Sequence, residues 1–145
     1  FYSNTNNNFF LTGVQMEVGP VATEFEQEDF GVTLAKCQRY YQKWLSDSVG
    51  DSVMTAAAIS DVAFIGDYFL RTSMRAPPTL GTSGTYKARL KTNDRAITGQ
   101  PSINRATTEN VQIFATIATD NNESGFAGFL KTDDDDAFLE FIAEL

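Results

Sequence analysis

After Ser46 the chain is interrupted by turn-forming residues about every eight to twelve positions, which leaves no room for a long helix. These turn signals are Gly50-Asp51, Pro77-Pro78, Gly81 to Gly84, Asn93-Asp94, Asp120 to Asn122 and Asp133 to Asp136. The intervening candidate strands are 53–59, 62–73, 85–92, 100–106, 110–118, 125–131 and 137–145. Many short strands at this spacing are typical of an antiparallel β-sandwich or jelly roll, so we expect a mainly β fold.

The last segment has the pattern of a strand that is buried on one face. Leu139, Phe141, Ala143 and Leu145 alternate with polar residues such as Glu140. Because successive side chains of a strand point to opposite faces, the apolar set is expected to face the core.

The residues before Ser46 predict one strand, an extended connector and one short helix. Thr12, Val14, Met16 and Val18 alternate with polar residues or glycine, as in a half-buried strand that Gly19-Pro20 would close. Residues 20–28 lack helical spacing and are expected to be extended.

An apolar stripe with a 4-3-4-3 spacing then indicates one face of a helix. Its members are Phe30, Leu34, Cys37, Tyr41 and Trp44. Asp29 is placed to cap the start, and the aromatic run after Tyr40 favours a strand, so we expect a helix over about residues 30–39 that gives way to strand. The stripe either packs against the rest of the domain or joins helices of different copies of the chain. Cys37 is expected to be a small buried residue.

Composition excludes several function classes. The 145 residues include no histidine and one cysteine, which rules out Ser-His-Asp and Cys-His catalysis, histidine-based zinc sites and an internal disulfide. A net charge of −8 disfavours nucleic acid as a partner. No apolar run is long enough to span a bilayer, so membrane insertion is not expected. We expect no cofactor and no enzymatic activity.

Two sets of aspartates could in principle bind a metal ion or catalyse hydrolysis. Within Asp133 to Asp136, Asp133 and Asp135 are weak candidates for a metal site, but the EF-hand pattern is not met and a solvated turn is the expected structure. Asp61 and Asp67 are acids of the type that glycoside hydrolysis uses, yet nothing in the sequence places them face to face.

Binding is expected at exposed aromatic rings and short polar loops at one end of the sandwich. The candidate glycan-binding residues are Tyr68, Tyr86, Asn93, Asp94, Asn121 and Asn122. Because the acidic chain repels polyanions, a neutral glycan, or an anionic one bridged by divalent cations, is expected. The arginines, Arg89 among them, are scattered one per segment and are interpreted as a solvated sheet face.

Three ordered motifs, LTGVQMEVG (residues 11–19), ATEFE (residues 22–26) and LAKCQRYY (residues 34–41), resemble a junction in tail-fibre and related virion proteins of tailed bacteriophages. The resemblance implies that residues 1–19 end an upstream jelly-roll-like domain. It also implies a connector and helix over residues 20–45, and a small C-terminal β-sandwich over residues 46–145. A chain that begins at Phe1 is then expected to be the trailing part of a longer polypeptide.

The resemblance implies a function in the virion and transfers no catalytic residue. It implies a distal tail-fibre domain that recognises a host-surface glycan and forms a homotrimer, with other virion proteins as partners. Two alternatives stay open: a capsid-surface fibre or decoration protein, and the non-catalytic accessory domain of a polysaccharide-degrading tailspike. In each case packing of the helix stripe is expected to assist assembly.

Overall fold

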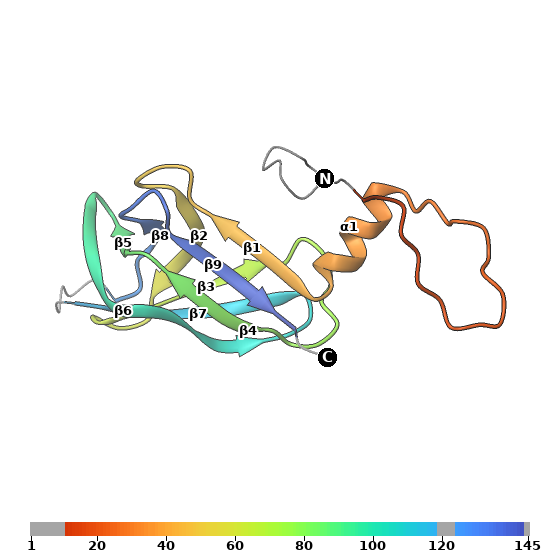
Figure 1. Cartoon of the computed structure of the whole chain (residues 1–145). Helices are drawn as coiled ribbons and strands as arrows, with labels where there is room; N and C mark the ends of the chain where they lie inside the picture. The colour runs from red at the N-terminus through yellow and green to blue at the C-terminus, as the bar shows by residue number, and fades with distance from the viewer. Residues whose placement is uncertain (1–10, 119–123, 144–145) are drawn as a thin grey trace, which may run out of the picture.

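The computed structural model describes residues 11–118 and 124–143, and it is mainly β with one short helix (Figure 1). The elements in chain order are α1 (Phe30–Gln38), β1 (Tyr41–Leu45), β2 (Ser52–Ala58), β3 (Ala63–Phe69), β4 (Thr79–Ser83), β5 (Tyr86–Leu90), β6 (Asn93–Ala106), β7 (Asn110–Ile117), β8 (Ala127–Thr132) and β9 (Phe138–Ile142). The predicted fold class, an antiparallel β domain preceded by an extended segment and a helix, is confirmed. No helix among the described residues is long and apolar enough to cross a membrane.

Six strands close into a barrel in the order β2-β3-β7-β6-β5-β8, and every pairing is antiparallel. The remaining strands form a second sheet in the order β1-β9-β4, which lies along the barrel in Figure 1. The ring of Tyr68 on β3 stacks on that of Phe141 on β9 with centroids 4.8 Å apart, so side chains of the two sheets meet. The result is a barrel with a sandwich-like second layer.

One buried cluster fills the space inside the barrel and beneath the second sheet. Strand β7 alternates strictly, burying Val111, Ile113 and Ala115 and turning its polar residues outward. Strand β9 buries Leu139 and Phe141, as its alternation predicts. Burial of apolar surface at about 25 cal/mol per Å² is the main stabilising force, so these two strands anchor both layers.

The helix and the strand after it form as expected. The carboxylate of Asp29 caps α1 by accepting a hydrogen bond from the Gly31 N–H at 2.8 Å. The apolar stripe, however, does not continue along one helix, since Tyr41 and Trp44 belong to β1. Residues of α1 are all partly or fully exposed, so the prediction that Cys37 is buried is wrong. Trp44, half-buried, packs against the core.

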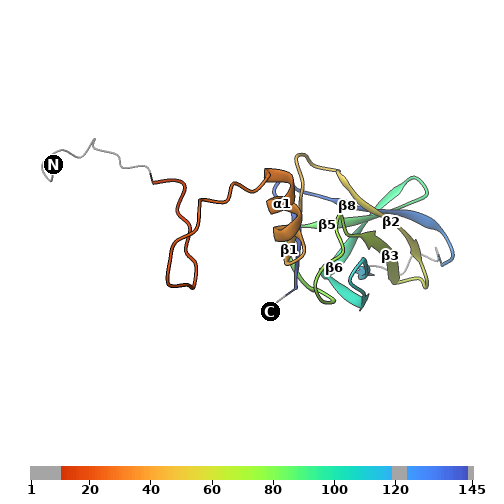
Figure 2. The same ribbon diagram turned by 90° about the vertical axis from the view of Figure 1, so that its right-hand side faces the viewer.

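The strand predicted over residues 12–18 does not form. Residues 11–29, which we call the arm, have no regular secondary structure, and their side chains are exposed. Figure 2 shows the arm reaching away from the barrel. A strand needs a hydrogen-bonded neighbour, and none of the described residues lies beside the arm in a sheet, so alternation alone cannot produce one.

Two predicted turns are displaced. The turn expected over Gly81 to Gly84 forms only at its end, at Gly84, between β4 and β5. Gly81 lies within β4, where a Cβ atom would stand 2.5 Å from the Glu140 carboxylate, so the glycine serves close packing and not a turn. Asn93 and Asp94 begin β6, and the turn lies two residues earlier, at Lys91 and Thr92. Strand β6 is longer than expected because it continues through an irregular register around Pro101.

Candidate functional site

Tyr86, a predicted glycan contact, is a core residue. It is 3% exposed, and its hydroxyl lies 2.7 Å from the carbonyl oxygen of Phe138 and 3.0 Å from that of Ser83. Burial, reinforced by the negative charge of Asp134, raises the pKa of Tyr86. A ring without an exposed face cannot stack on a sugar, so this prediction is wrong.

The other predicted contacts are dispersed. Tyr68 is half-buried against Phe141, and burial raises the pKa of the Tyr68 hydroxyl. Asn93 and Asp94 are exposed at the start of β6. No hydrogen bond or ring contact among the described residues joins Tyr68 to either of them. Asn121 and Asn122 lie outside the described residues.

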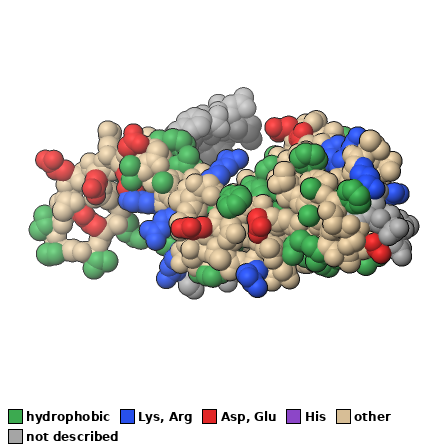
Figure 3. All heavy atoms as spheres, turned by 180° about the vertical axis from the view of Figure 1, so that it is seen from behind, with side chains coloured by type: hydrophobic (Ala, Val, Ile, Leu, Met, Phe, Trp, Pro, Cys, Tyr) green, Lys and Arg blue, Asp and Glu red, His purple; other side chains and the backbone are tan. Residues whose placement is uncertain are grey.

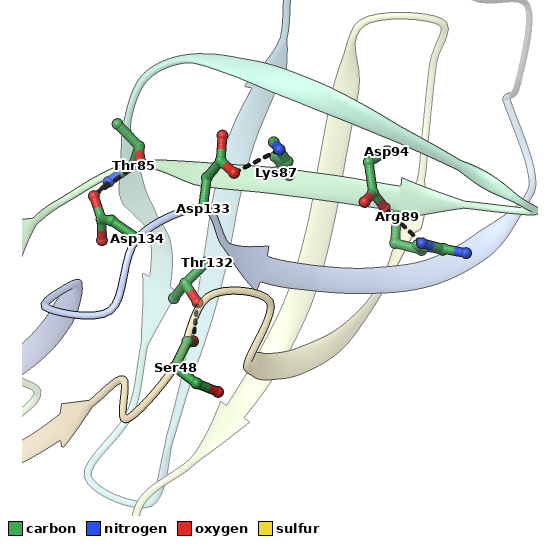
Figure 4. A network of polar contacts seen from close by, with 8 residues as sticks. All are labelled: Ser48, Thr85, Lys87, Arg89, Asp94, Thr132, Asp133 and Asp134. Carbon is green, nitrogen blue, oxygen red and sulfur yellow. Dashed lines mark hydrogen bonds and ion pairs between the residues drawn. The ribbon is translucent and has the colours of Figure 1, made fainter.

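The aspartate run after β8 is a turn held by hydrogen bonds and an ion pair. Asp133 pairs with Lys87 at 2.5 Å, and the Asp134 carboxylate accepts hydrogen bonds from the backbone N–H and hydroxyl of Thr85 (Figure 4). Within residues 11–118 and 124–143, no group of three or more acidic or cysteine side chains is placed to hold a metal ion. Asp133 and Asp135, the weak metal candidates, therefore have too few acidic neighbours among the described residues to form a metal site.

A different site is visible on the outer face of the barrel, where a depression of about 410 Å³ lies over β5, β8 and β2. We call it the basic groove. Its lining residues are Gly50, Ser52, Arg89, Lys91, Ala127, Gly128, Phe129 and Lys131.

Strand register brings these residues together. Phe129 on β8 pairs with Thr55 on β2 and with Arg89 on β5, so the three side chains form one outward-facing row. Lys131, two residues further along β8, points to the same face and pairs with Ser52 and Lys87 in a second row. The groove is therefore built mainly on barrel strands, and adjoining loops add Gly50 and Lys91.

The electrostatics of the groove differ from those of the whole chain. Arg89 forms an ion pair with Asp94 at 3.1 Å, and Lys91 places its ammonium 3.8 Å from the centroid of the Phe126 ring. Neither Lys91 nor Lys131 has an ion-pair partner among the described carboxylates. Three cations against the one paired carboxylate give a local charge of +2 on a chain of net charge −8. Figure 3 shows lysine and arginine side chains at the end of the barrel far from the arm, and a second group at the end near the arm.

Lys91 occupies an unusual backbone conformation. Its φ of 52° lies in the left-handed region, and it is the one residue other than glycine with a positive φ in the part of the chain that the structure describes. This conformation is costly for a side chain with a Cβ atom, and such strain clusters at functional sites. The tight β5–β6 turn thus carries a lysine where glycine would fit with less strain.

The groove continues into a second depression of about 370 Å³ over β2 and β3. Both depressions are lined by Ala127. The second one adds Thr55, Asp67 and Phe69, whose ring is 75% exposed. A ligand longer than one sugar can therefore lie across β5, β8, β2 and β3.

Sequence reasoning missed this groove because its cations come from segments about 40 residues apart, which only the β5–β8 pairing joins. A signal was present in the alternation of Lys87, Arg89 and Lys91, which predicts one cationic face on a strand. Phe129 and Lys131 are likewise two residues apart, which predicts that they share one face of their own strand.

Among the described residues, no hydrogen bond joins Asp61 to Asp67, and Asp67 accepts one from the side-chain amide of Gln112. In the part of the chain that the structure describes, three carboxyl groups have a shifted pKa, and each shift is downward. The Thr23 hydroxyl lowers the pKa of Glu17, the Lys36 ammonium lowers that of Glu28, and the Asp47 backbone N–H lowers that of Asp51. A general acid needs a raised pKa.

Comparison of the chain with models of known protein families, with curated proteins and with solved structures finds no match in any of the three.

Proposed function

We propose that this chain is the distal part of a bacteriophage tail fibre, which binds a glycan on the host surface and acts as a homotrimer in the virion. The three ordered motifs over residues 11–41 support the assignment to a fibre. The antiparallel barrel with a second sheet agrees with the small β domain that this resemblance implies.

The basic groove carries the proposal of glycan recognition. Phe129 is 45% exposed at the centre of a row of polar and cationic side chains, on strands of a closed barrel. A flat apolar ring beside hydrogen-bonding groups suits a pyranose, which has an apolar face and a polar edge. Strands hold such groups more accurately than loops do.

The arm and α1 support the proposal of assembly with other copies and other virion proteins. Val14, Met16, Val18 and Phe30 are exposed in the single chain. Large apolar side chains that gather on one exposed segment are typical of an interaction surface.

We further propose that the chain binds and does not catalyse. The complete absence of histidine and the downward pKa shifts of Glu17, Glu28 and Asp51 support binding as the function. A capsid-surface fibre or decoration protein is the second candidate, since the exposed arm favours assembly equally. The accessory domain of a tailspike is the third, and an upstream hydrolase domain would favour it.

An adsorption experiment tests the proposal. Fluorescently labelled chain is mixed with a panel of capsulated and uncapsulated bacteria, and cell-bound label is measured for wild type, Phe129→Ala and Leu45→Ala. Leu45 is exposed on β1, outside the groove, and provides the matched control. We expect wild type and Leu45→Ala to adsorb to at least one strain and Phe129→Ala to lose adsorption. Absence of adsorption to every strain would favour the purely structural candidate.

A further inference from the structure

We propose that the basic groove binds an acidic saccharide, one whose sugar residues carry carboxylate groups. This inference rests on the proposed function and names its ligand class. The acidic composition of the whole chain predicts a neutral glycan or one bridged by cations, whereas the local charge of the groove favours a carboxylate bound directly.

The cations have donors available for a ligand. Arg89 uses one terminal nitrogen for Asp94, while its side chain stays 40% exposed, and a guanidinium offers five N–H donors in a planar fork. Lys91 and Lys131 have no carboxylate partner among the described residues. The neighbouring Lys87 is satisfied by Asp133 and serves as an internal contrast. A ligand carboxylate would supply the missing negative charge.

The arrangement around Phe129 suits a sugar acid. Arg89 stands beside the ring in the same row, and Lys131 follows two residues along the strand on the same face, about 7 Å away. A pyranose stacked on Phe129 would thus have the Arg89 guanidinium at one edge and the Lys131 ammonium at an adjacent edge. Lys91 lines the groove from the β5–β6 turn, with its ammonium over the ring of Phe126.

No lysine or arginine among the described residues lines the second depression beyond Ala127, although Arg71 lines a third that shares Thr55, Asp67 and Phe69 with it. This gap in positive charge favours a saccharide over nucleic acid. Beyond Ala127 the surface offers Phe69 and the carboxylate of Asp67, a combination that accepts sugar hydroxyls and repels phosphate. A single-stranded nucleic acid needs positive charge along its whole backbone. A polysaccharide that mixes carboxylate-bearing and neutral sugars matches the change from cationic to apolar and acidic lining.

The test uses the intact chain and three uronate polysaccharides: polygalacturonate, alginate and hyaluronan. Each is paired with its carboxyl-reduced, neutral form, and affinity is measured by titration calorimetry with and without a chelator. We expect at least one acidic form to bind about tenfold or more tightly than its neutral partner, without dependence on divalent cations, and to weaken as salt rises. Equal affinity for both forms, or no binding to any of the three acids, would overturn the inference.

Single substitutions locate the site. Arg89→Gln, Lys91→Gln and Lys131→Gln are each expected to weaken binding about three- to tenfold or more. Lys36→Gln removes the same charge from α1 and is expected to leave affinity unchanged. An equal loss in Lys36→Gln, or equal binding of oligothymidylate, would show that binding responds to positive charge anywhere on the chain and not to the groove, and would overturn the inference. If wild type adsorbs to bacteria but binds no uronate, the ligand class is wrong and glycan recognition stands; if neither occurs, both proposals fail.

Discussion

At Lys91, the proposed binding of an acidic saccharide would favour a residue that costs stability. The left-handed conformation costs a residue with a Cβ atom about 1–2 kcal/mol, and the contact between its ammonium and Phe126 returns only about 0.5–1 kcal/mol. Stability alone therefore favours glycine at this position. A lysine is favoured here only if its ammonium contacts a ligand, such as the proposed carboxylate.

We predict that Lys91→Gly leaves the free energy of unfolding unchanged or raises it by up to about 1 kcal/mol, because relief of strain offsets the lost cation–π contact. The same variant is expected to lose uronate affinity. Urea unfolding and calorimetry measure the two effects separately. A variant that unfolds more easily and binds normally would contradict this view of Lys91.

We predict that Tyr86→Phe lowers the free energy of unfolding by about 1–2 kcal/mol, because it removes the hydroxyl of a buried ring that donates a hydrogen bond to the carbonyl oxygen of Phe138. Tyr41→Phe is the matched control. Tyr41 is exposed and donates to the carboxylate of Glu140 at 3.0 Å, so its loss is expected to cost less than about 0.5 kcal/mol. Urea midpoints of the two variants decide between a core and a surface role.

At the level of single residues, the sequence predicted positions governed by their immediate neighbours. Asp29 caps α1 because an aspartate before a helix bonds the first free N–H groups wherever the helix lies. Cys37 and Tyr86 were assigned the wrong surroundings, since burial depends on which face of an element meets the core. That information comes from the packing of distant segments.

Strand β8 is the element on which the groove depends. It pairs with both β2 and β5, and its Gly128 lies so close to β5 that an added Cβ atom would overlap the carbonyl oxygen of Arg89. Glycine is needed here for the approach of two backbones, with no positive φ involved.

We predict that Gly128→Ala lowers the free energy of unfolding by about 3 kcal/mol or more, because the β5–β8 pair must separate to admit the methyl group. Gly19→Ala, in the exposed arm, would bring its Cβ atom only to an ordinary contact with the carbonyl of Val21 and is expected to be neutral. Thermal melts compare the two. Equal melting temperatures would show that the strands tolerate the wider spacing.

The loop between β1 and β2 contains a carboxylate whose protonation affects stability. Asp51 accepts hydrogen bonds from the backbone N–H groups of Asp47 and Ser48, and these contacts lower the pKa of its carboxyl group. A pKa that is lower in the folded state means that the stabilisation is complete above the unfolded value and is lost as pH falls through the folded value.

We therefore predict that Asp51→Asn is less stable than wild type near neutral pH, and that the difference shrinks at a pH well below 3.8, the ordinary pKa of this carboxyl group, as the folded protein takes up the proton. Urea midpoints measured at both pH values test this. A difference that is the same at both would assign the effect of the substitution to the shape of the side chain and not to its charge.

The strands themselves were largely predictable, and the exceptions have a common cause. Alternation located β7 and β9 closely, because one face of each meets a continuous core. Strand β4 was read as a turn because Gly81 and Gly84 are typical turn residues, and only the packing of Glu140 explains Gly81. The pairing order that closes the barrel has no local signal at all, and the basic groove depends on that order.

For the whole molecule, the arm and α1 leave a large apolar surface in water, which we expect a trimer to cover. We predict that light scattering gives the mass of three chains, because cyclic symmetry would bury the same exposed side chains in each copy. Met16→Asp and Phe30→Asp should dissociate the trimer, whereas Phe69→Asp, an equally drastic change on the barrel, should leave the mass unchanged.

Dissociation of the trimer should also weaken cell adsorption more than uronate affinity per chain, since avidity is lost while each groove stays intact. A monomer mass for wild type at all concentrations would contradict the trimer.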